Sequence, residues 1–244
     1  MSIVYGPNVG LMAGAADGDL YGDAMRAFQR GIDGLVMPNA KGYLTNTPPG
    51  SPSDGDLYII GAAPTGAWAG QGGKVTRWSS VANAWEFYTP KNGWMIQANS
   101  ARESYRYTGG AWEIFYQEGT WTPYIYGSIT AGTNTYSVQS GKYRRIGPMC
   151  FAYGYVLVTT KDSSMAGSVR IGGLPITVAI DAFSACATWA HSLATEMPRF
   201  SALFNNNSTD VLLFKQATNQ ESIYVDSADI ASGAHIHVSG TYPF

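Results

Sequence analysis

From residue 44 onward, turns that contain glycine or proline divide the sequence into short segments. Turn residues stand at Pro64-Thr65-Gly66, Gly70–Gly73, Lys91–Gly93 and Gly109-Gly110, and segments rich in Trp, Tyr, Val and Ile lie between them. Short apolar segments bounded by Gly, Pro and Asn are typical of β-strands joined by tight turns. The chain from residue 44 is therefore predicted to be mainly β.

Charged side chains are scarce in this chain. Asp, Glu, Lys and Arg make up 13% of the residues and the net charge is −2, whereas about 25% is usual in soluble proteins. The longest basic run is Arg144-Arg145, which is no basic stripe, so nucleic acid is not an expected partner. No apolar run approaches the ~20 residues that cross a bilayer, so membrane insertion is not expected. Low charge predicts either burial against other subunits or binding of neutral polar ligands such as sugars.

Residues 1–43 are rich in Ala and Gly and contain one helical pattern. Apolar side chains recur at three- and four-residue steps from Leu20 to Leu35, and Pro38 follows. This spacing predicts a short helix. Its Gly residues weaken it, so the helix is expected to pack on its own chain or to form a short bundle with other copies.

Residues 44–118 are predicted to form a small aromatic-rich β domain. A domain of this size is hard to stabilise with aliphatic side chains alone, so most of its rings are assigned to the core, and one or two are candidates for stacking on a sugar. The expected strands are 56–60, 74–78, 84–88, 94–98, 104–107 and 111–115.

The run from Leu44 to Glu113 resembles a domain of unknown function found in tail-fibre and spike proteins of phages and gene-transfer agents. The matching segments are PPGSPSDGDLYII, GAAPTGAWAGQGGKVTRW, AWEFYTPKNGW and YRYTGGAWE. In that family a helical segment precedes the module. The resemblance therefore implies that residues 1–43 serve attachment or oligomerisation, although here Gly and Ala replace the family's more polar pattern.

Residues 119–244 are predicted to form an antiparallel β-sandwich of jelly-roll type. Many short strands with turns every ~8–12 residues favour that architecture. The expected strand from Met149 to Thr160 is apolar on both faces, which predicts an interior strand or one that another subunit covers. GTWTP, the spaced set Tyr136–Gly147 and the pentapeptide Ile171–Pro175 resemble C-terminal domains of phage tail fibres. That resemblance implies a receptor-binding domain.

The C-terminal domain also contains the candidate glycan-binding residues. Neutral glycans are held by aromatic rings together with amide and hydroxyl groups. Polar loops of this kind are also ordinary hairpin connections, and both interpretations stay open. The candidates are Trp189, His191, Asn205, Asn206, Asn207 and Tyr224. Trimerisation would present several copies and raise avidity.

His235 and His237 are the candidate metal ligands. They are one residue apart in a predicted strand, so their side chains point to the same face. Two imidazoles are too few for a tight site, but three chains around an axis would offer an octahedral set, a use that the tail-fibre resemblance supports. The alternative is a solvent-facing pair. No other cofactor is expected.

Catalysis is not predicted, because the chain has no GxSxG, HExxH or P-loop motif. The sequence leaves Asp226 and Asp229 as a carboxylate pair of the kind glycosidases use. Together these features and resemblances predict a homotrimeric phage tail-fibre or spike subunit, made in the bacterial cytoplasm and located in the virion. It would contact other virion proteins through its N-terminal part and host polysaccharide through its C-terminal domain. The alternatives are a structural adaptor or decoration protein without a ligand, and a capsule depolymerase.

Overall fold

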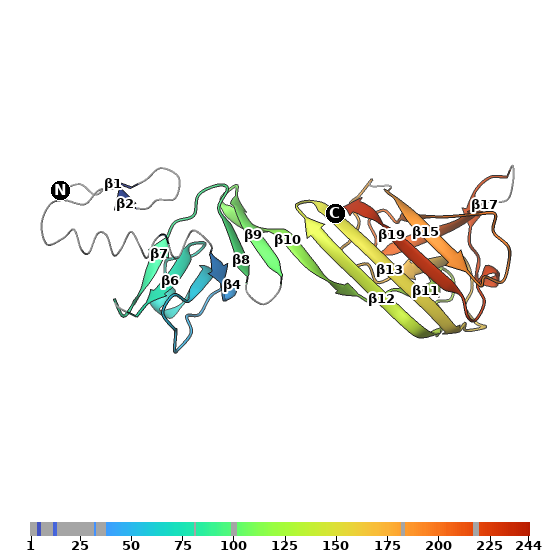
Figure 1. Cartoon of the computed structure of the whole chain (residues 1–244), viewed down its shortest axis with the longest axis horizontal. Helices are drawn as coiled ribbons and strands as arrows, with labels where there is room; N and C mark the ends of the chain where they lie inside the picture. Colours follow the sequence, from blue (N-terminus) through green and yellow to red (C-terminus); the bar gives the residue numbers. More distant parts are fainter. Residues whose placement is uncertain are drawn as a thin grey trace, which may run out of the picture. The chain divides into compact units, whose positions relative to one another are not determined.

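A computed structural model of the chain divides it into two compact units, Met1–Gln117 and Glu118–Phe244. The structure describes residues 38–244 except residues 81, 99–101, 182–183 and 217–219, and before residue 38 only residues 4–5, 12–13 and 32. Figure 1 labels the strands of each unit. The predicted N-terminal helix, apart from Ile32, lies outside the described residues.

Two small sheets and a strand pair make up the first unit. One sheet has the order β4-β5-β6-β7, and β3, β8, β9 and the first part of β10 follow one another in the other. The elements are β1 Val4–Tyr5, β2 Met12–Ala13, β3 Asn39–Ala40, β4 Gly42–Thr45, β5 Leu57–Ile60, the 3-10 turn η1 Gly66–Trp68, β6 Val75–Ser79, β7 Ala84–Tyr88, β8 Met95–Ala98, β9 Glu103–Thr108 and β10 Ala111–Trp121. All six strands expected in residues 44–118 are present.

Aromatic rings fill the first unit, as the small size of the domain requires. Trp68 is fully buried and meets Trp85 edge to face, with ring centroids 5.1 Å apart. The Trp112 indole donates a hydrogen bond to the carbonyl of Gly73 at 2.9 Å. That bond ties the β10 hairpin to the turn before β6.

The second unit is an antiparallel, sandwich-like β structure. Its strands follow one another in the order β11-β14-β17-β16-β15-β19-β13-β12, and Figure 1 shows β12, β13, β19 and β15 side by side. The elements are β11 Tyr124–Gly127, β12 Thr135–Ile146, β13 Met149–Thr160, β14 Val169–Gly172, β15 Ser184–His191, β16 Arg199–Phe204, β17 Asp210–Gln216, β18 Ile223–Tyr224, the 3-10 turn η2 Ser227–Asp229 and β19 His235–Pro243. The predicted mainly β fold with a β-sandwich is confirmed.

Side chains of β12 satisfy the outer edge of β11. The Tyr136 hydroxyl accepts a hydrogen bond from the Ile125 N–H at 2.9 Å and donates one to the Ile125 carbonyl at 3.1 Å. Gln139 Nε2 donates to the Pro123 carbonyl at 2.8 Å. Because buried backbone groups need partners, these bonds replace the backbone ladder at this edge and hold β11 against β12.

Trp121 of the GTWTP motif lies on a pair of glycines. Gly141 of β12 and Gly154 of β13 are directly opposed in the ladder. A Cβ at Gly141 would stand 2.5 Å from Trp121 Nε1, and a Cβ at Gly154 would stand 2.6 Å from Trp121 Cζ2. The indole N–H donates to the Tyr153 carbonyl at 3.0 Å. The motif is therefore a packing device in which the absence of two side chains makes room for one large ring.

The strand β13 differs from its prediction on one point. Cys150, Ala152, Val156 and Val158 are buried on its inner face, but on the outer face Phe151 is 45% exposed and Tyr153 is 41% exposed. The expectation of an interior strand covered on both faces is wrong, because none of the described strands of this unit packs over the outer face of β13. Cover by another subunit stays a prediction.

Gly154→Ala is expected to destabilise the second unit by about 1–3 kcal/mol, the usual cost of overpacking a core. The added methyl group would overlap the Trp121 ring. The urea midpoint, followed by far-UV circular dichroism, measures the effect. In a Trp121→Ala background the same substitution should cost far less, since its obstacle is gone. Equal costs in both backgrounds would show that the ring is not the constraint.

Candidate functional site

One outer face of the second unit gathers aromatic and imidazole side chains from three adjacent strands. In the ladder, Trp189 of β15 is paired with His237 of β19, and His237 is paired with Tyr155 of β13. His191 is paired with His235 in the same way. All 3 histidines of the chain lie here. We call this surface the aromatic–imidazole face, made of Tyr153, Tyr155, Trp189, His191, His235 and His237.

The rings of this face are in direct contact. His237 stacks on Tyr155 with centroids 4.1 Å apart, and the Trp189 ring meets His237 edge-on at 5.0 Å. His191 stacks on His235 at 3.8 Å. Trp189 is still 54% exposed. The strands thus hold a continuous, prearranged set of rings at the surface, of which Trp189, Tyr153 and His191 are the exposed ones.

Burial and neighbouring imidazoles set the charge state of His235 and His237. The Tyr155 hydroxyl is 2.9 Å from His235 Nδ1, and His191 Nδ1 is 2.8 Å from Ser192 Oγ. Desolvation lowers the pKa of His235 and of His237, and repulsion from the neighbouring imidazoles lowers both further. These two imidazoles therefore stay neutral at neutral pH and can both donate and accept hydrogen bonds.

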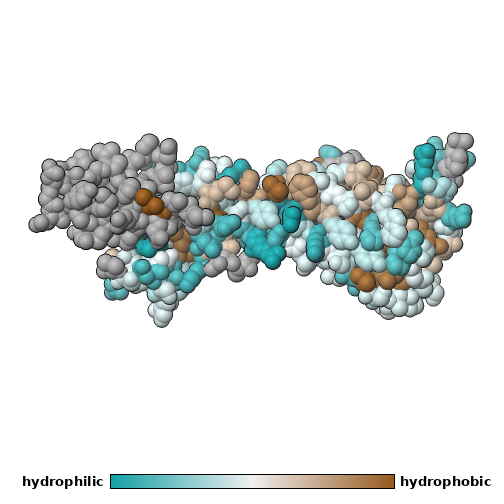
Figure 2. Space-filling view, in the orientation of Figure 1, coloured by the Kyte–Doolittle hydropathy of each residue, from teal (hydrophilic) through white to brown (hydrophobic). Residues whose placement is uncertain are grey.

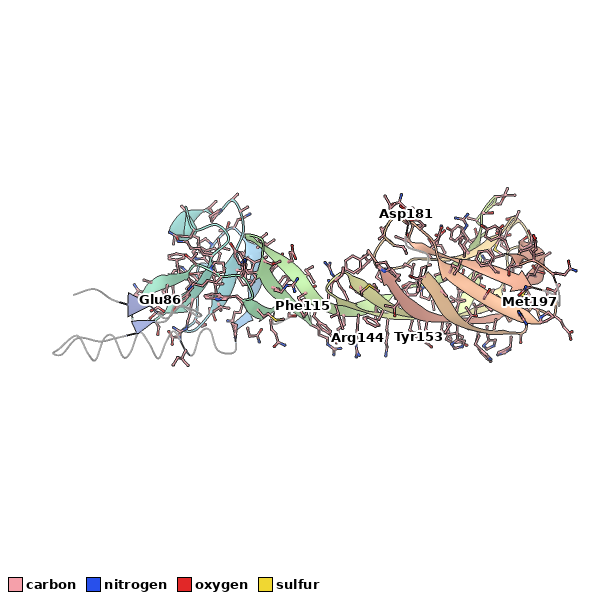
Figure 3. The ribbon with its side chains drawn as sticks, turned by 90° about the horizontal axis from the view of Figure 1, so that it is seen from above. Glu86, Phe115, Arg144, Tyr153, Asp181 and Met197 are labelled. Atoms are coloured by element: carbon pink, nitrogen blue, oxygen red, sulfur yellow. The ribbon has the colours of Figure 1, made fainter. Side chains whose placement is uncertain are left out.

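The outward positions of β13, β15 and β19 carry no Asp, Glu, Lys or Arg among the described residues. Beyond the ring residues they are small, hydroxylated or apolar: Ala185, Ala187, Ser239, Thr241, Phe151 and Leu157. Charge begins on the flanking strands. On β12, Lys142 and Arg144 are paired with Tyr153 and Phe151, and β16, which pairs with β15, begins with the exposed Arg199. Figure 3 shows Arg144 and Tyr153 projecting from the same side of the sheet. In Figure 2, residues of intermediate (white) and high (brown) hydropathy lie among hydrophilic residues (teal) on the surface of the second unit.

Such a face suits a neutral ligand that has both C–H and hydroxyl groups. Ring faces attract the C–H groups of a sugar, and neutral imidazoles, indole and phenol groups supply hydrogen bonds. The sequence identified Trp189 and His191 as candidates but missed Tyr153, Tyr155 and their contact with His237. The signal was available in the alternating tyrosines of Met149–Thr160, which were assigned to burial.

The other predicted glycan residues lie elsewhere. Asn205 follows Phe204, which is paired with Ser184 at the start of β15, so this loop is about 17 Å along the strand from Trp189. Asn205 Nδ2 donates to Asp210 Oδ1 at 2.6 Å, and Asn206 Oδ1 accepts from the Asp181 N–H at 2.8 Å. Asn207 has a left-handed backbone with φ of 51°. These contacts are those of an ordered hairpin connection.

Tyr224 belongs to a third place in the second unit. It lies on β18, and its ring stacks on Phe214 with centroids 4.9 Å apart. The structure therefore joins Trp189 with His191 but does not bring either of them to the Asn loop or to Tyr224.

His235 and His237 do share the outer face of β19, but one chain does not supply a metal site. No group of three or more possible ligands occurs among the described residues. The His191 and His235 rings lie face to face, tilted by only 23°, so their nitrogens do not converge on one point. The predicted site needs ligands from three chains, and it stays a prediction.

Asp226 and Asp229 are capping residues of η2. The Asp226 carboxylate accepts a hydrogen bond from the Ala228 N–H at 3.1 Å, and Asp229 accepts one from the Asp226 N–H at 2.8 Å. Together they form a capping box around this turn. The closeness of these two carboxylates is therefore explained by their structural role in capping the turn.

Comparison with known proteins finds one family match. Residues 26–113 match the family described as "Protein of unknown function (DUF2793)". No curated protein matches the chain. Among solved structures the chain is similar to the Dettilon tailspike protein, with 20% sequence identity and a TM-score of 0.44. That similarity covers 53% of this chain, and the chain spans only 24% of the tailspike. Within the described part of the chain, no helix has the length and apolar character to cross a membrane.

Acidification is expected to destabilise the second unit in the range where histidine titrates. The folded-state pKa values of His235 and His237 lie below the unfolded value of about 6.5. The unfolded chain then binds more protons, so stability is lost as pH falls through 6.5 toward the folded-state values. Urea midpoints at about pH 7.5 and about pH 5.5, with EDTA present, measure the loss.

His191→Gln removes a neighbouring imidazole that contributes to the lowered pKa of His235 and of His237, and it is expected to reduce this loss. If the variant and the natural chain lose the same stability between the two pH values, the contact between imidazoles does not contribute.

Proposed function

We propose that this chain is a subunit of a phage tail fibre or spike that binds host-surface glycan through its C-terminal β unit. The exposed, uncharged aromatic–imidazole face is the observation that carries this proposal. The match of residues 26–113 to a domain of unknown function, together with the GTWTP and Tyr136–Gly147 resemblances, supports the virion assignment. The N-terminal part would attach the subunit to the particle.

The sugar is expected to lie against Trp189, with His191, His237 and Tyr155 supplying hydrogen bonds. Asn205, Asn206, Asn207 and Tyr224 form separate candidate contacts. If a long polysaccharide reaches from the aromatic–imidazole face to the Asn loop and to Tyr224, each of these contacts adds to the affinity independently. If they serve only the loops that hold them, their substitution leaves affinity unchanged.

Trp189→Ala is expected to weaken glycan binding about 2- to 12-fold, the equivalent of about 0.5–1.5 kcal/mol for one aromatic contact. An array of host polysaccharides finds the ligand, and calorimetry compares the variants. Ile129→Ala is the matched control, because Ile129 is another large apolar side chain of this unit and is 82% exposed. Loss of affinity in the control but not in Trp189→Ala would overturn the assignment of the face.

A structural adaptor is the second candidate function. It predicts stable docking to tail proteins and no binding to any host polysaccharide. A capsule depolymerase, in contrast, predicts the release of reducing sugar ends. Incubating the purified chain with host polysaccharide therefore separates all three functions.

The scarcity of charge supports a homotrimer, and sedimentation analysis is expected to give three times the mass of one chain. A stable monomer at micromolar concentration would contradict it. The predicted metal ion on the trimer axis is tested by metal analysis of the natural chain and of the His235→Ala and His237→Ala variants. Bound metal that both substitutions remove would place this face at a subunit contact, and would thereby exclude it as the glycan site.

A further inference from the structure

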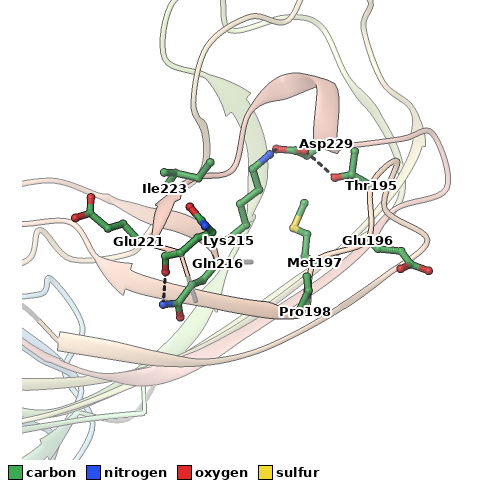
Figure 4. Close-up of a pocket in the computed structure, with 10 residues that line it drawn as sticks. Thr195, Glu196, Met197, Pro198, Lys215, Gln216, Glu221, Ile223 and Asp229 are labelled. Carbon is green, nitrogen blue, oxygen red and sulfur yellow. Dashed lines mark hydrogen bonds and ion pairs between the residues drawn. The ribbon is translucent and has the colours of Figure 1, made fainter. Parts of the chain in front are cut away.

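A pocket separate from the aromatic–imidazole face opens where three connections of the second unit meet. It lies between Thr195–Pro198, the end of β17 with Gln220, Glu221 and Ile223, and Asp229 of η2, and its volume is about 540 Å³. Pockets for small ligands usually have about 300–1,000 Å³, so this one accommodates one or two sugar rings. Figure 4 shows the side chains that line it.

The floor of the pocket is a fixed ion pair. Asp229 is 3% exposed and accepts hydrogen bonds from Lys215 Nζ at 2.5 Å and from Thr195 Oγ1 at 2.7 Å. Burial raises the pKa of Asp229, but the hydrogen bonds from Lys215, Thr195 and the Asp226 N–H outweigh it and hold the pKa below its usual value. The carboxylate is therefore ionised, and it fixes the Lys215 ammonium in place.

Lys215 retains hydrogen-bonding capacity toward the pocket. Among the described residues its ammonium has one acceptor, Asp229, whereas an ammonium has three N–H donors. Met197 and Ile223 line the same space with apolar groups. A fixed donor beside an apolar wall matches a sugar ring, which has hydroxyls at its rim and C–H groups on its faces.

Charge decides which sugar fits. Glu196 and Glu221 stand on opposite sides of the pocket in Figure 4, where both carboxylates are exposed at its rim and point outward. Neither forms an ion pair among the described residues. With Asp229, the lining has three carboxylates and one ammonium, that of Lys215. The Arg199 guanidinium donates to Gln216 Oε1 of the lining at 3.5 Å, so the carboxylates outnumber the cations by one. This excess of negative charge repels a ligand carboxylate.

We propose that this pocket binds a single sugar residue that carries no acid group, a neutral or amino-substituted hexose of the host glycan. The inference rests on the proposed function and adds a second contact point with its own charge selectivity. Glu196 and Glu221 make the pocket bind uronic and sialic acids more weakly than sugars without an acid group.

Saturation-transfer NMR on the full chain tests the proposal with methyl glucoside, methyl galactoside, glucosamine, N-acetylglucosamine and glucuronic acid as probes. A non-acidic probe is expected to bind at least about 3- to 10-fold more tightly than glucuronic acid at low salt. Met197→Ala should weaken the non-acidic probe about 5-fold through lost apolar contact. The double variant Glu196→Gln, Glu221→Gln should remove most of the discrimination against glucuronic acid.

Glu113→Gln is the matched control, since it makes the same chemical change on an exposed strand of the first unit. Lys215→Met is less informative alone because it leaves Asp229 buried without its partner. Equal binding of glucuronic acid and neutral probes, or pocket variants that change nothing, overturns the pocket assignment. If Trp189→Ala abolishes binding whereas the pocket variants do not, the proposed function stands without the pocket. If no probe binds at about 10 mM, both the pocket assignment and the proposed glycan-binding function are overturned.

Discussion

The placement of the Trp121 ring on the Gly141–Gly154 pair is the constraint on which the second unit depends. Two opposed residues without side chains open a space in the β12–β13 ladder, and a single indole fills it and donates to the Tyr153 carbonyl. The ring anchors the end of β10 to the inner side of β13. Because side chains alternate along a strand, Tyr153 and Tyr155 lie on the outer side of β13, where their rings contribute to the candidate site.

The strand content of this chain follows from its sequence because turn residues and apolar segments alternate at short range. The segment predicted at 74–78 is β6, Val75–Ser79, and the one predicted at 84–88 is β7. Exposure does not follow in the same way. An apolar residue such as Phe151 occurs both in cores and on surfaces, so its presence in the sequence does not reveal which face of β13 is exposed.

The candidate site was only partly predictable, since register brings its residues together. Trp189 and His237 are far apart in the sequence, and only the pairing of β15 with β19 makes them neighbours. The pocket at Lys215 has no motif, because three separate connections contribute to it. Asp226 and Asp229 are a different case: their spacing leaves a carboxylate pair open in the sequence, and the structure shows that both residues cap a local backbone turn.

The edge of β11 is protected against pairing with a strand of a neighbouring chain. An open strand edge is a template on which a neighbouring chain can add a strand, and this leads to aggregation. Here the Tyr136 hydroxyl occupies both the N–H and the carbonyl of Ile125, and Gln139 occupies the Pro123 carbonyl. An incoming strand would have to displace these side chains before it could pair. The second unit can therefore be held at high local concentration without polymerising through this edge.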